Sequence, residues 1–287
     1  MIGEHSRRGH SGCASDWNGS MSTTASRLLY VDLAAITHLT TGLSFDLDQC
    51  VPVLDQVLLE LNQQTGIPDQ LLAWIRAGAF ATGPCPYDGR GRIIIDVTQT
   101  VSAGGQYGYF ATVLRKSDER ETAPAVFFSM CSPTLDIPMR VEIPLRAMLL
   151  GNPPLAGTYT LYLHALLTNQ GNSFIYYGIT KRGWSLRFNE HTRAAIAQKS
   201  KRLLASTLND LIEARAAELY GTVDQRPKLA GLVSAVCGVG MTREAALEAE
   251  ERLVDKYSLA SKHPYGLNMI PGGLAGLKQA RRSLRDF

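Results

Sequence analysis

The feature that most constrains this sequence is a break at residues 151–157, GNPPLAG, where two prolines stand between glycines. Proline ends helices and cannot donate to a strand ladder, and glycine favours turns, so no regular element is expected to cross this segment. The break divides the 287 residues into two halves of ordinary domain size. We therefore predict an α+β protein with two domains, residues 21–150 and residues 157–275.

Both ends of the chain are expected to lie outside these domains. Residues 1–20 are rich in Gly, Ser, Arg and His and contain no apolar run, which predicts a disordered lead. Residues 276–287 carry Lys278, Arg281, Arg282 and Arg285 and are expected to form a basic tail.

The pattern of the first half changes from helical to extended. Apolar residues within 50–62 fall on one face of a helix, and Pro68 is placed to open a second helix. Four short runs rich in β-branched and aromatic residues follow, at 92–97, 107–114, 125–130 and 139–145. Because Gly, Pro, Asp and Ser separate them, we predict an antiparallel β-meander with residues 115–122 as a charged hairpin loop.

The second half has a different order of elements. The patterns predict two strands joined by the turn NQGN, two helices, an apolar strand and a further helix that Thr242 caps. In chain order these elements are residues 158–167, 173–180, 184–198, 201–220, 229–239 and 243–257.

Charge separates the two halves as well. Residues 157–287 contain 18 Lys and Arg against 11 Asp and Glu, a net +7, which leaves 29 − 18 = 11 basic and 26 − 11 = 15 acidic residues, a net −4, in the remainder. A basic half suits a polyanion such as nucleic acid, although an ordinary solvated surface gives the same count.

Two further observations bear on the compartment. The five cysteines are scattered and form no CxxC pair, which fits reduced thiols in the cytoplasm better than a disulfide framework. No apolar stretch approaches the about 20 residues that a membrane-spanning helix needs, so no membrane partner is expected.

Several residues of the second half have chemistry suited to one site. Tyr162 lies on the first predicted strand, and the second strand carries Tyr176-Tyr177-Gly178. On the following helix, Arg187 and His191 are four residues apart and so share one face.

Two more residues complete the set. Glu250 lies on the last predicted helix, where two residues separate it from the apolar pair Leu253-Val254, and Asn268 stands in a Gly-Leu-Asn turn. These residues, in this order and on these elements, resemble the GIY-YIG nuclease superfamily over residues 157–275. Only the tyrosine remains of the first family motif, and the second differs at its middle position.

The resemblance implies a three-stranded antiparallel sheet flanked by helices and a metal-dependent endonuclease that hydrolyses phosphodiester bonds in DNA. Glu250 would hold Mg²⁺ or Mn²⁺, and Arg187 would brace the scissile phosphate. Tyr162 and Tyr176 would point into the cleft, with Tyr162 as general base and His191 placing the water or relaying the proton. The last two roles can be exchanged. Basic residues expected to contact nucleic acid are Lys181, Arg182, Arg193, Lys199, Lys201 and Arg202.

Alternatives stay open at this point. Glu251 is the rival metal ligand, and Asn268 also fits a plain turn. The protein can equally be a nucleic-acid-binding module with little cleavage, or a toxin or defence effector. RNA is not excluded as the substrate, and residues 21–150 are expected to recognise the target, form a homodimer or dock a protein partner.

Overall fold

The computed structural model describes residues 28–78, 92–116, 123–132, 137–198, 200–221 and 225–283. The expected disordered lead, residues 1–20, lies outside the described residues, as do Lys199 and residues 284–287 of the expected tail.

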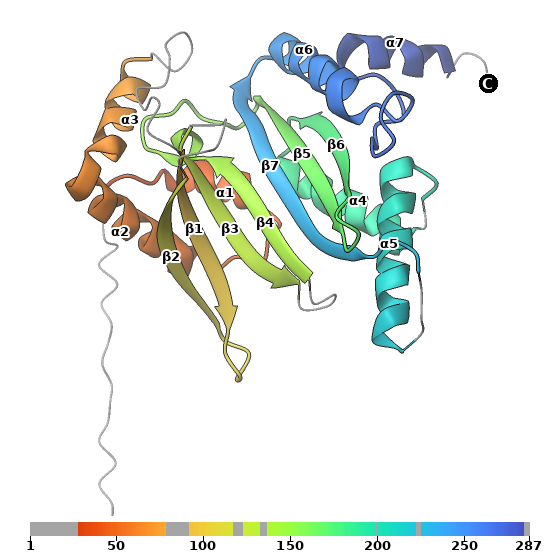
Figure 1. Cartoon of the computed structure of the whole chain (residues 1–287). Helices are drawn as coiled ribbons and strands as arrows, with labels where there is room; N and C mark the ends of the chain where they lie inside the picture. Colours follow the sequence, from red (N-terminus) through yellow and green to blue (C-terminus); the bar gives the residue numbers. More distant parts are fainter. Residues whose placement is uncertain are drawn as a thin grey trace, which may run out of the picture.

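The protein has the predicted α+β composition, with all strands in one twisted sheet (Figure 1). The strands are β1 (Arg92–Val101), β2 (Tyr107–Lys116), β3 (Ala125–Ser132), β4 (Ile137–Pro144), β5 (Tyr159–Thr168), β6 (Ser173–Thr180) and β7 (Leu229–Met241). The α-helices are α1 (Leu33–Thr40), α2 (Leu47–Thr65), α3 (Ile67–Arg76), α4 (Trp184–Ile196), α5 (Leu203–Leu219), α6 (Arg243–Leu253) and α7 (Gly273–Ser283). Two short turns complete them, the 3₁₀-helix η2 (Leu145–Met148) and the π-helix η3 (Val254–Ser258).

The strand order is β2-β1-β3-β4-β7-β5-β6, which corrects the predicted meander. β1 pairs antiparallel with β2 on one side and parallel with β3 on the other. Consecutive residues of β1, Ile93 to Ile95, are all fully buried, as in a strand covered on both faces, and such a strand lies inside a sheet rather than at its edge. Of the predicted hairpin loop, residues 115 and 116 belong to β2 and residues 117–122 lie outside the described residues. β2 and β3 do not pair with each other, because they lie on opposite sides of β1.

The sheet is continuous across the break at residues 151–157. β4 and β7 pair in parallel, from Met139 opposite Leu232 to Glu142 opposite Ala235. The largest hydrophobic cluster also contains residues of both halves, including Tyr162 and Trp184. The residues of the break itself lie outside helices and strands. The two halves thus share one sheet and one core.

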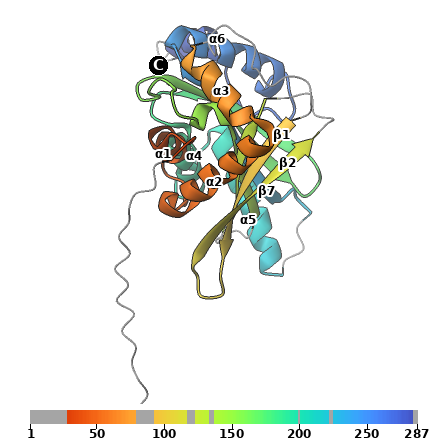
Figure 2. The same ribbon diagram turned by 90° about the vertical axis from the view of Figure 1, so that its left-hand side faces the viewer.

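In the first half, the helices pack as the apolar pattern predicts. α2 buries Cys50, Leu54, Leu58 and Leu61 on one face and packs against β2, and Pro68 lies in the first turn of α3 (Figure 2). The Asp55 carboxylate on α2 accepts the backbone N–H groups of residues 29, 30 and 31 at 2.8–2.9 Å, which fixes the start of the described chain on the helix.

The second half contains the predicted elements in the predicted order. Thr242 caps α6, with its hydroxyl accepting the N–H of Ala245 at 3.2 Å. Residues 276–283, expected within a basic tail, belong to α7, which packs on α6. Among the described residues, no helix combines the length and the apolar character that a bilayer crossing requires.

Candidate active site

The site is built on the antiparallel pair β5 and β6. Tyr162 lies opposite Gly178, and His164 lies opposite Tyr176, so these side chains share the sheet face that α4 covers. A Cβ at position 178 would lie only 2.6 Å from the Tyr162 Oη atom. Glycine at this position therefore makes the room in which the Tyr162 ring lies across the neighbouring strand.

The Tyr162 ring is 1% exposed, and Tyr162 is not among the residues that line the cleft described below. Burial raises the pKa of its phenol well above the ordinary value, and the nearby Tyr176 raises it further. The charge of Arg187 and its hydrogen bond to the phenol offset only part of this rise. The expectation that Tyr162 points into the cleft is thus corrected, because the space beside Gly178 lets its ring lie under Arg187.

Helix α4 carries Arg187 and His191 on the face turned to these strands. Three side chains from its first half attach it to the C-terminal end of α1. Trp184 Nε1 donates to the Leu39 carbonyl at 2.8 Å, Ser185 Oγ donates to the Thr41 carbonyl, and Asn189 Nδ2 donates to the Gly42 carbonyl at 3.0 Å. The Leu39 carbonyl, in the last turn of α1 and without a partner inside the helix, is in this way satisfied by α4. The first half of the chain consequently fixes the helix that bears two predicted site residues.

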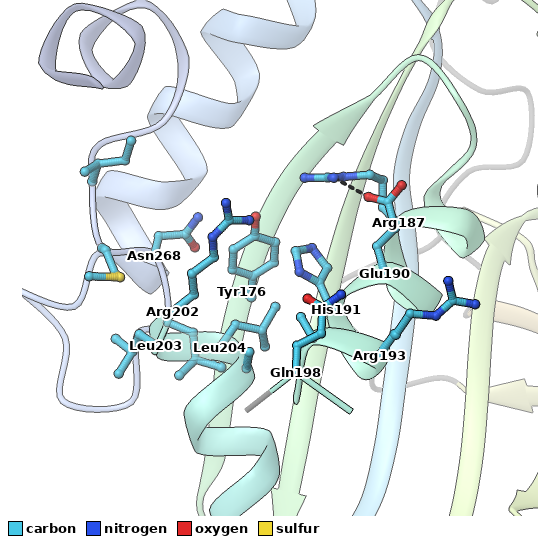
Figure 3. Close-up of a pocket in the computed structure, with 15 residues that line it drawn as sticks. Tyr176, Arg187, Glu190, His191, Arg193, Gln198, Arg202, Leu203, Leu204 and Asn268 are labelled. Atoms are coloured by element: carbon cyan, nitrogen blue, oxygen red, sulfur yellow. Dashed lines mark hydrogen bonds and ion pairs between the residues drawn. The ribbon is translucent and has the colours of Figure 1, made fainter. Parts of the chain in front are cut away.

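A cleft of about 590 Å³ opens between α4, the start of α5 and residues 267–270 (Figure 3). Tyr176, Arg187 and His191 line it, together with Arg193 and Arg202. The rings of Tyr176 and His191 are neighbours, with their centroids 5.2 Å apart, and lie between Arg202 on one side and Arg187 on the other. Burial raises the pKa of Tyr176 and lowers that of His191, and the charge of Arg202 lowers the pKa of both side chains. The cleft thus joins a tyrosine, a histidine and three guanidinium groups.

An acidic residue that the sequence analysis did not single out also faces this cleft. Glu190 forms ion pairs with Arg187 and, at 2.8 Å, with Arg182. Partial burial raises the pKa of Glu190, but the hydrogen bond and charge of Arg187 and the charge of Arg182 lower it below its ordinary value. The i, i+3 spacing of Arg187 and Glu190 on one helix could have predicted this ion pair from the sequence. A bound anion must therefore compete with Glu190 for Arg187.

Both histidines of the site are neutral at pH 7. Burial lowers the pKa of His191 to about 4, and the charge of Arg187 adds to this effect. His164, which the sequence analysis missed, is 1% exposed, and burial lowers its pKa to about 3. Its Nδ1 lies 2.9 Å from Ser234 Oγ, and its ring stands 6.1 Å from that of His191. The alternation of strand residues could have revealed it, since His164 lies two positions from Tyr162 on the same face.

The outer edge of β6 is closed by a segment from the C-terminal part of the chain. Ile175 exchanges backbone hydrogen bonds with Tyr265 and Leu267, each at 2.9 Å. The Asn268 side chain then takes the place of a further strand residue, because its Oδ1 accepts the Tyr177 N–H at 3.1 Å and its Nδ2 donates to the Tyr177 carbonyl at 2.8 Å. Ser258 Oγ donates to the same Oδ1 at 2.7 Å. Asn268 therefore orders the strand that bears Tyr176.

Glu250 continues this closure of the edge. Its Oε2 accepts the Gly273 N–H at 3.0 Å, and the Ile179 N–H of β6 is a further backbone hydrogen-bond donor to it. Gly273 has φ +60°, and a Cβ there would lie 2.3 Å from the Leu247 carbonyl, so only glycine permits this approach of α7 to α6. Burial raises the pKa of the Glu250 carboxyl, and the two backbone hydrogen bonds lower it in part.

Glu250 is not among the residues that line the cleft. Burial raises the pKa of both Tyr162 and Tyr176, and the charge of Glu250 adds to the rise in both. The rival Glu251 turns to α7, where its Oε2 accepts the Ala275 N–H at 3.3 Å. The structure thus places Glu250 against β6, the strand that bears Tyr176, and its expected convergence with Arg187 around one phosphate stays a prediction.

The residues present are compatible with one divalent cation at Glu250. In the part of the chain that the structure describes, no three His, Cys, Asp or Glu side chains cluster as a metal cage. A half-buried carboxylate whose pKa burial raises, and whose partners named above are backbone amides, nevertheless has charge that a cation would neutralise. A single carboxylate, with water and substrate oxygens, is a common magnesium site.

The basic residues expected to contact nucleic acid fall into two groups. Arg193 and Arg202 line the cleft. Arg182 is paired with Glu190, and Lys181 and Lys201 are exposed outside the cleft lining.

Comparison of the chain with known protein families, with curated proteins and with solved structures found no significant match. The chemistry of the site therefore stands on its own geometry.

The space at position 178 gives a first prediction. Gly178→Ala should lower the free energy of unfolding by about 1–3 kcal/mol, because the added methyl group overlaps the Tyr162 hydroxyl. Urea unfolding measures this change. Gly104→Ala is the control, since the nearest atom to its Cβ is 3.8 Å away, and it should change stability by less than about 0.5 kcal/mol. Equal stability of Gly178→Ala and wild type would contradict the packing described.

The two neutral histidines predict a pH dependence of stability. An unfolded imidazole takes up a proton near pH 6.5, whereas His191 does so near pH 4, so the unfolded state binds more protons between these values. This contribution to stability is fully present above pH 6.5 and is lost as the pH falls toward 4, by at most about 1.4 kcal/mol per pH unit for each histidine. Urea unfolding from pH 7 to 4 should show a shallower loss in His191→Gln. An identical slope in wild type and variant would contradict the burial of a neutral His191.

Proposed function

We propose that this protein is a metal-dependent endonuclease that hydrolyses phosphodiester bonds in nucleic acid, with DNA as the first candidate. The observation that carries the proposal is the convergence of Arg187, His191 and Tyr176 on one cleft, with the Glu250 carboxylate hydrogen-bonded to the backbone of the strand that bears Tyr176. The resemblance of these residues to the GIY-YIG motifs supports the same reaction. Three requirements of the chemistry can be matched to residues in turn.

The first requirement is a site for the anionic phosphate. Arg187, Arg193 and Arg202 bring three positive charges to the cleft, and Glu190 cancels one of them. A guanidinium offers paired N–H donors that match two phosphate oxygens. A phosphate bound at Arg187 would replace Glu190, whose carboxylate is close to half exposed and can turn to solvent.

The second requirement is a base for the attacking water. Tyr162 is poorly suited, because it is buried and its pKa is raised. His191 lines the cleft and is neutral above about pH 4, and its Nε2, although buried, has no hydrogen-bond partner among the described residues. We therefore assign the general base to His191, which takes a proton from the water as the water oxygen bonds to phosphorus and the bond from phosphorus to the leaving oxygen breaks. Tyr162 then acts as a positioning residue under Arg187.

The third requirement is positive charge where negative charge develops. Glu250 is the residue that would hold Mg²⁺ or Mn²⁺, and the ion would stabilise the charge on the phosphate and leaving oxygens. Its hydrogen bonds with Gly273 and Ile179 keep the carboxylate in one orientation. Glu251 does not fit this role, since its carboxylate is directed to the start of α7.

A second candidate is a nucleic-acid-binding protein with little or no cleavage. The ion pair between Arg187 and Glu190 favours it, because this pair occupies the guanidinium that a scissile phosphate needs. The burial of Tyr162 favours it as well. The two candidates differ in whether phosphodiester bonds are cut when Mg²⁺ is present.

Glu250→Gln tests the proposal. It should lower the rate of Mg²⁺-dependent plasmid cleavage by about 100-fold or more, since the amide removes the charge that holds the cation. Affinity for a labelled duplex in EDTA should stay within about twofold of wild type. Gel analysis of plasmid nicking and fluorescence anisotropy measure these two quantities.

Glu251→Gln is the matched control and should cleave at nearly the wild-type rate, because glutamine can still accept the Ala275 N–H. Loss of cleavage in Glu251→Gln but not in Glu250→Gln would contradict the assignment. Binding without cleavage by the wild type, with Mg²⁺ or Mn²⁺, would favour the second candidate.

A further inference from the structure

We infer that the cleft binds a nucleotide whose base is unpaired, so that the preferred substrate is a single strand or a duplex with an extruded base. This inference rests on the proposed function, because it takes the cleft as the place where the phosphate is bound. To the proposed function it adds whether the bound nucleic acid is paired or unpaired. The inference is argued from the apolar character of the cleft wall opposite Arg187.

That wall is apolar and partly open to solvent. It is formed by Leu203 and Leu204 from the start of α5 and by Leu267, Met269 and Ile270 from the segment between η3 and α7. Met269 is 62% exposed and Ile270 is 40% exposed. Large apolar side chains that stay exposed beside a charged cleft suggest a ligand that covers them.

A nucleotide combines the two features that this cleft combines. Its phosphate is an anion for Arg187, Arg193 and Arg202, and its base presents a flat face of low polarity. Tyr176 also lines the cleft, and aromatic rings are the usual partners of unpaired bases. The volume, about 590 Å³, lies in the range of small-molecule sites and is sufficient for one nucleotide.

An intact duplex does not explain the apolar wall. In a duplex the bases are paired and stacked, so a protein that approaches the backbone meets sugars and charged phosphates. Met269 and Ile270 would then face a polyanion and bury no apolar surface. A base rotated out of the stack can instead cover these apolar side chains. The free energy needed to unstack the base is smallest when it is already unpaired.

Binding by the full-length protein tests the inference. Fluorescence anisotropy in EDTA compares a labelled single strand of DNA, the same sequence as RNA, the intact DNA duplex and that duplex with one bulged nucleotide. The single strands and the bulged duplex should bind about tenfold more tightly than the intact duplex at equal salt. The DNA and RNA strands show which sugar the site prefers.

The double variant Met269→Ser with Ile270→Ser should weaken binding of the single strand and the bulged duplex about tenfold, and leave the intact duplex within about twofold of wild type. The matched control is Leu274→Ser with Leu277→Ser, since these residues are similarly exposed but lie on α7 away from the cleft. Circular dichroism melting checks that both variants are folded as the wild type is. The control should bind all four nucleic acids as the wild type does.

Equal affinity of the wild type for intact and bulged duplexes would overturn the inference. An equal loss of affinity for the two duplexes in the variant Met269→Ser with Ile270→Ser would overturn it as well. The result is separable from the proposed function. Cleavage of the intact duplex at the same rate as the bulged one, with Mg²⁺, would reject the unpaired-base site and leave the nuclease. Selective binding of unpaired strands without any cleavage would keep the site and reject the nuclease.

Discussion

The site depends on how the last strand of the sheet is closed at its outer edge. An edge strand leaves alternate N–H and C=O groups without partners, and here those of Ile175, Tyr177 and Ile179 point away from β5. The backbone of residues 265–267, the amide of Asn268 and the carboxylate of Glu250 satisfy them in turn. This closure brings Glu250 and Asn268 to the strand that bears Tyr176, more than 70 residues earlier in the chain. A carboxylate and a phenol that the sequence separates thereby become neighbours.

A second constraint connects the two halves of the chain. The carbonyls of Leu39 in the last turn of α1 and of Thr41 and Gly42 just after it accept hydrogen bonds from side chains of α4. Since α4 carries Arg187 and His191, the first half takes part in building the site. The parallel pairing of β4 with β7 extends the same sheet across both halves. A role of residues 21–150 in recognising a target or partner stays a prediction, and it would be exercised from the same rigid sheet.

Local patterns in the sequence were sufficient to predict most of the helices and strands. They were insufficient to predict which strands pair with each other. The helix at Cys50–Asn62, the cap at Thr242 and the order of elements after residue 157 follow from periodicity and turn chemistry, which act over a few residues. The parallel pairing of β1 with β3 depends on contacts between distant segments, although the unbroken apolar run Ile93 to Ile95 is typical of a strand covered on both faces. The i, i+4 spacing placed Arg187 and His191 on one face of α4 as expected. It could not show that Tyr162 is covered, because alternation along a strand gives the face of a side chain and not what lies over it.

Binding of Mn²⁺ tests the role of Glu250 most directly, since it needs neither a substrate nor turnover. Titration of the wild type and of Glu250→Gln at pH 7.5, followed by the electron paramagnetic resonance signal of the free ion, measures it. We expect the wild type to take up a single Mn²⁺ ion and Glu250→Gln to lose this binding while keeping its fold. Equal uptake by both proteins, or none by either at millimolar Mn²⁺, would contradict the assignment of the Glu250 carboxylate as the metal ligand.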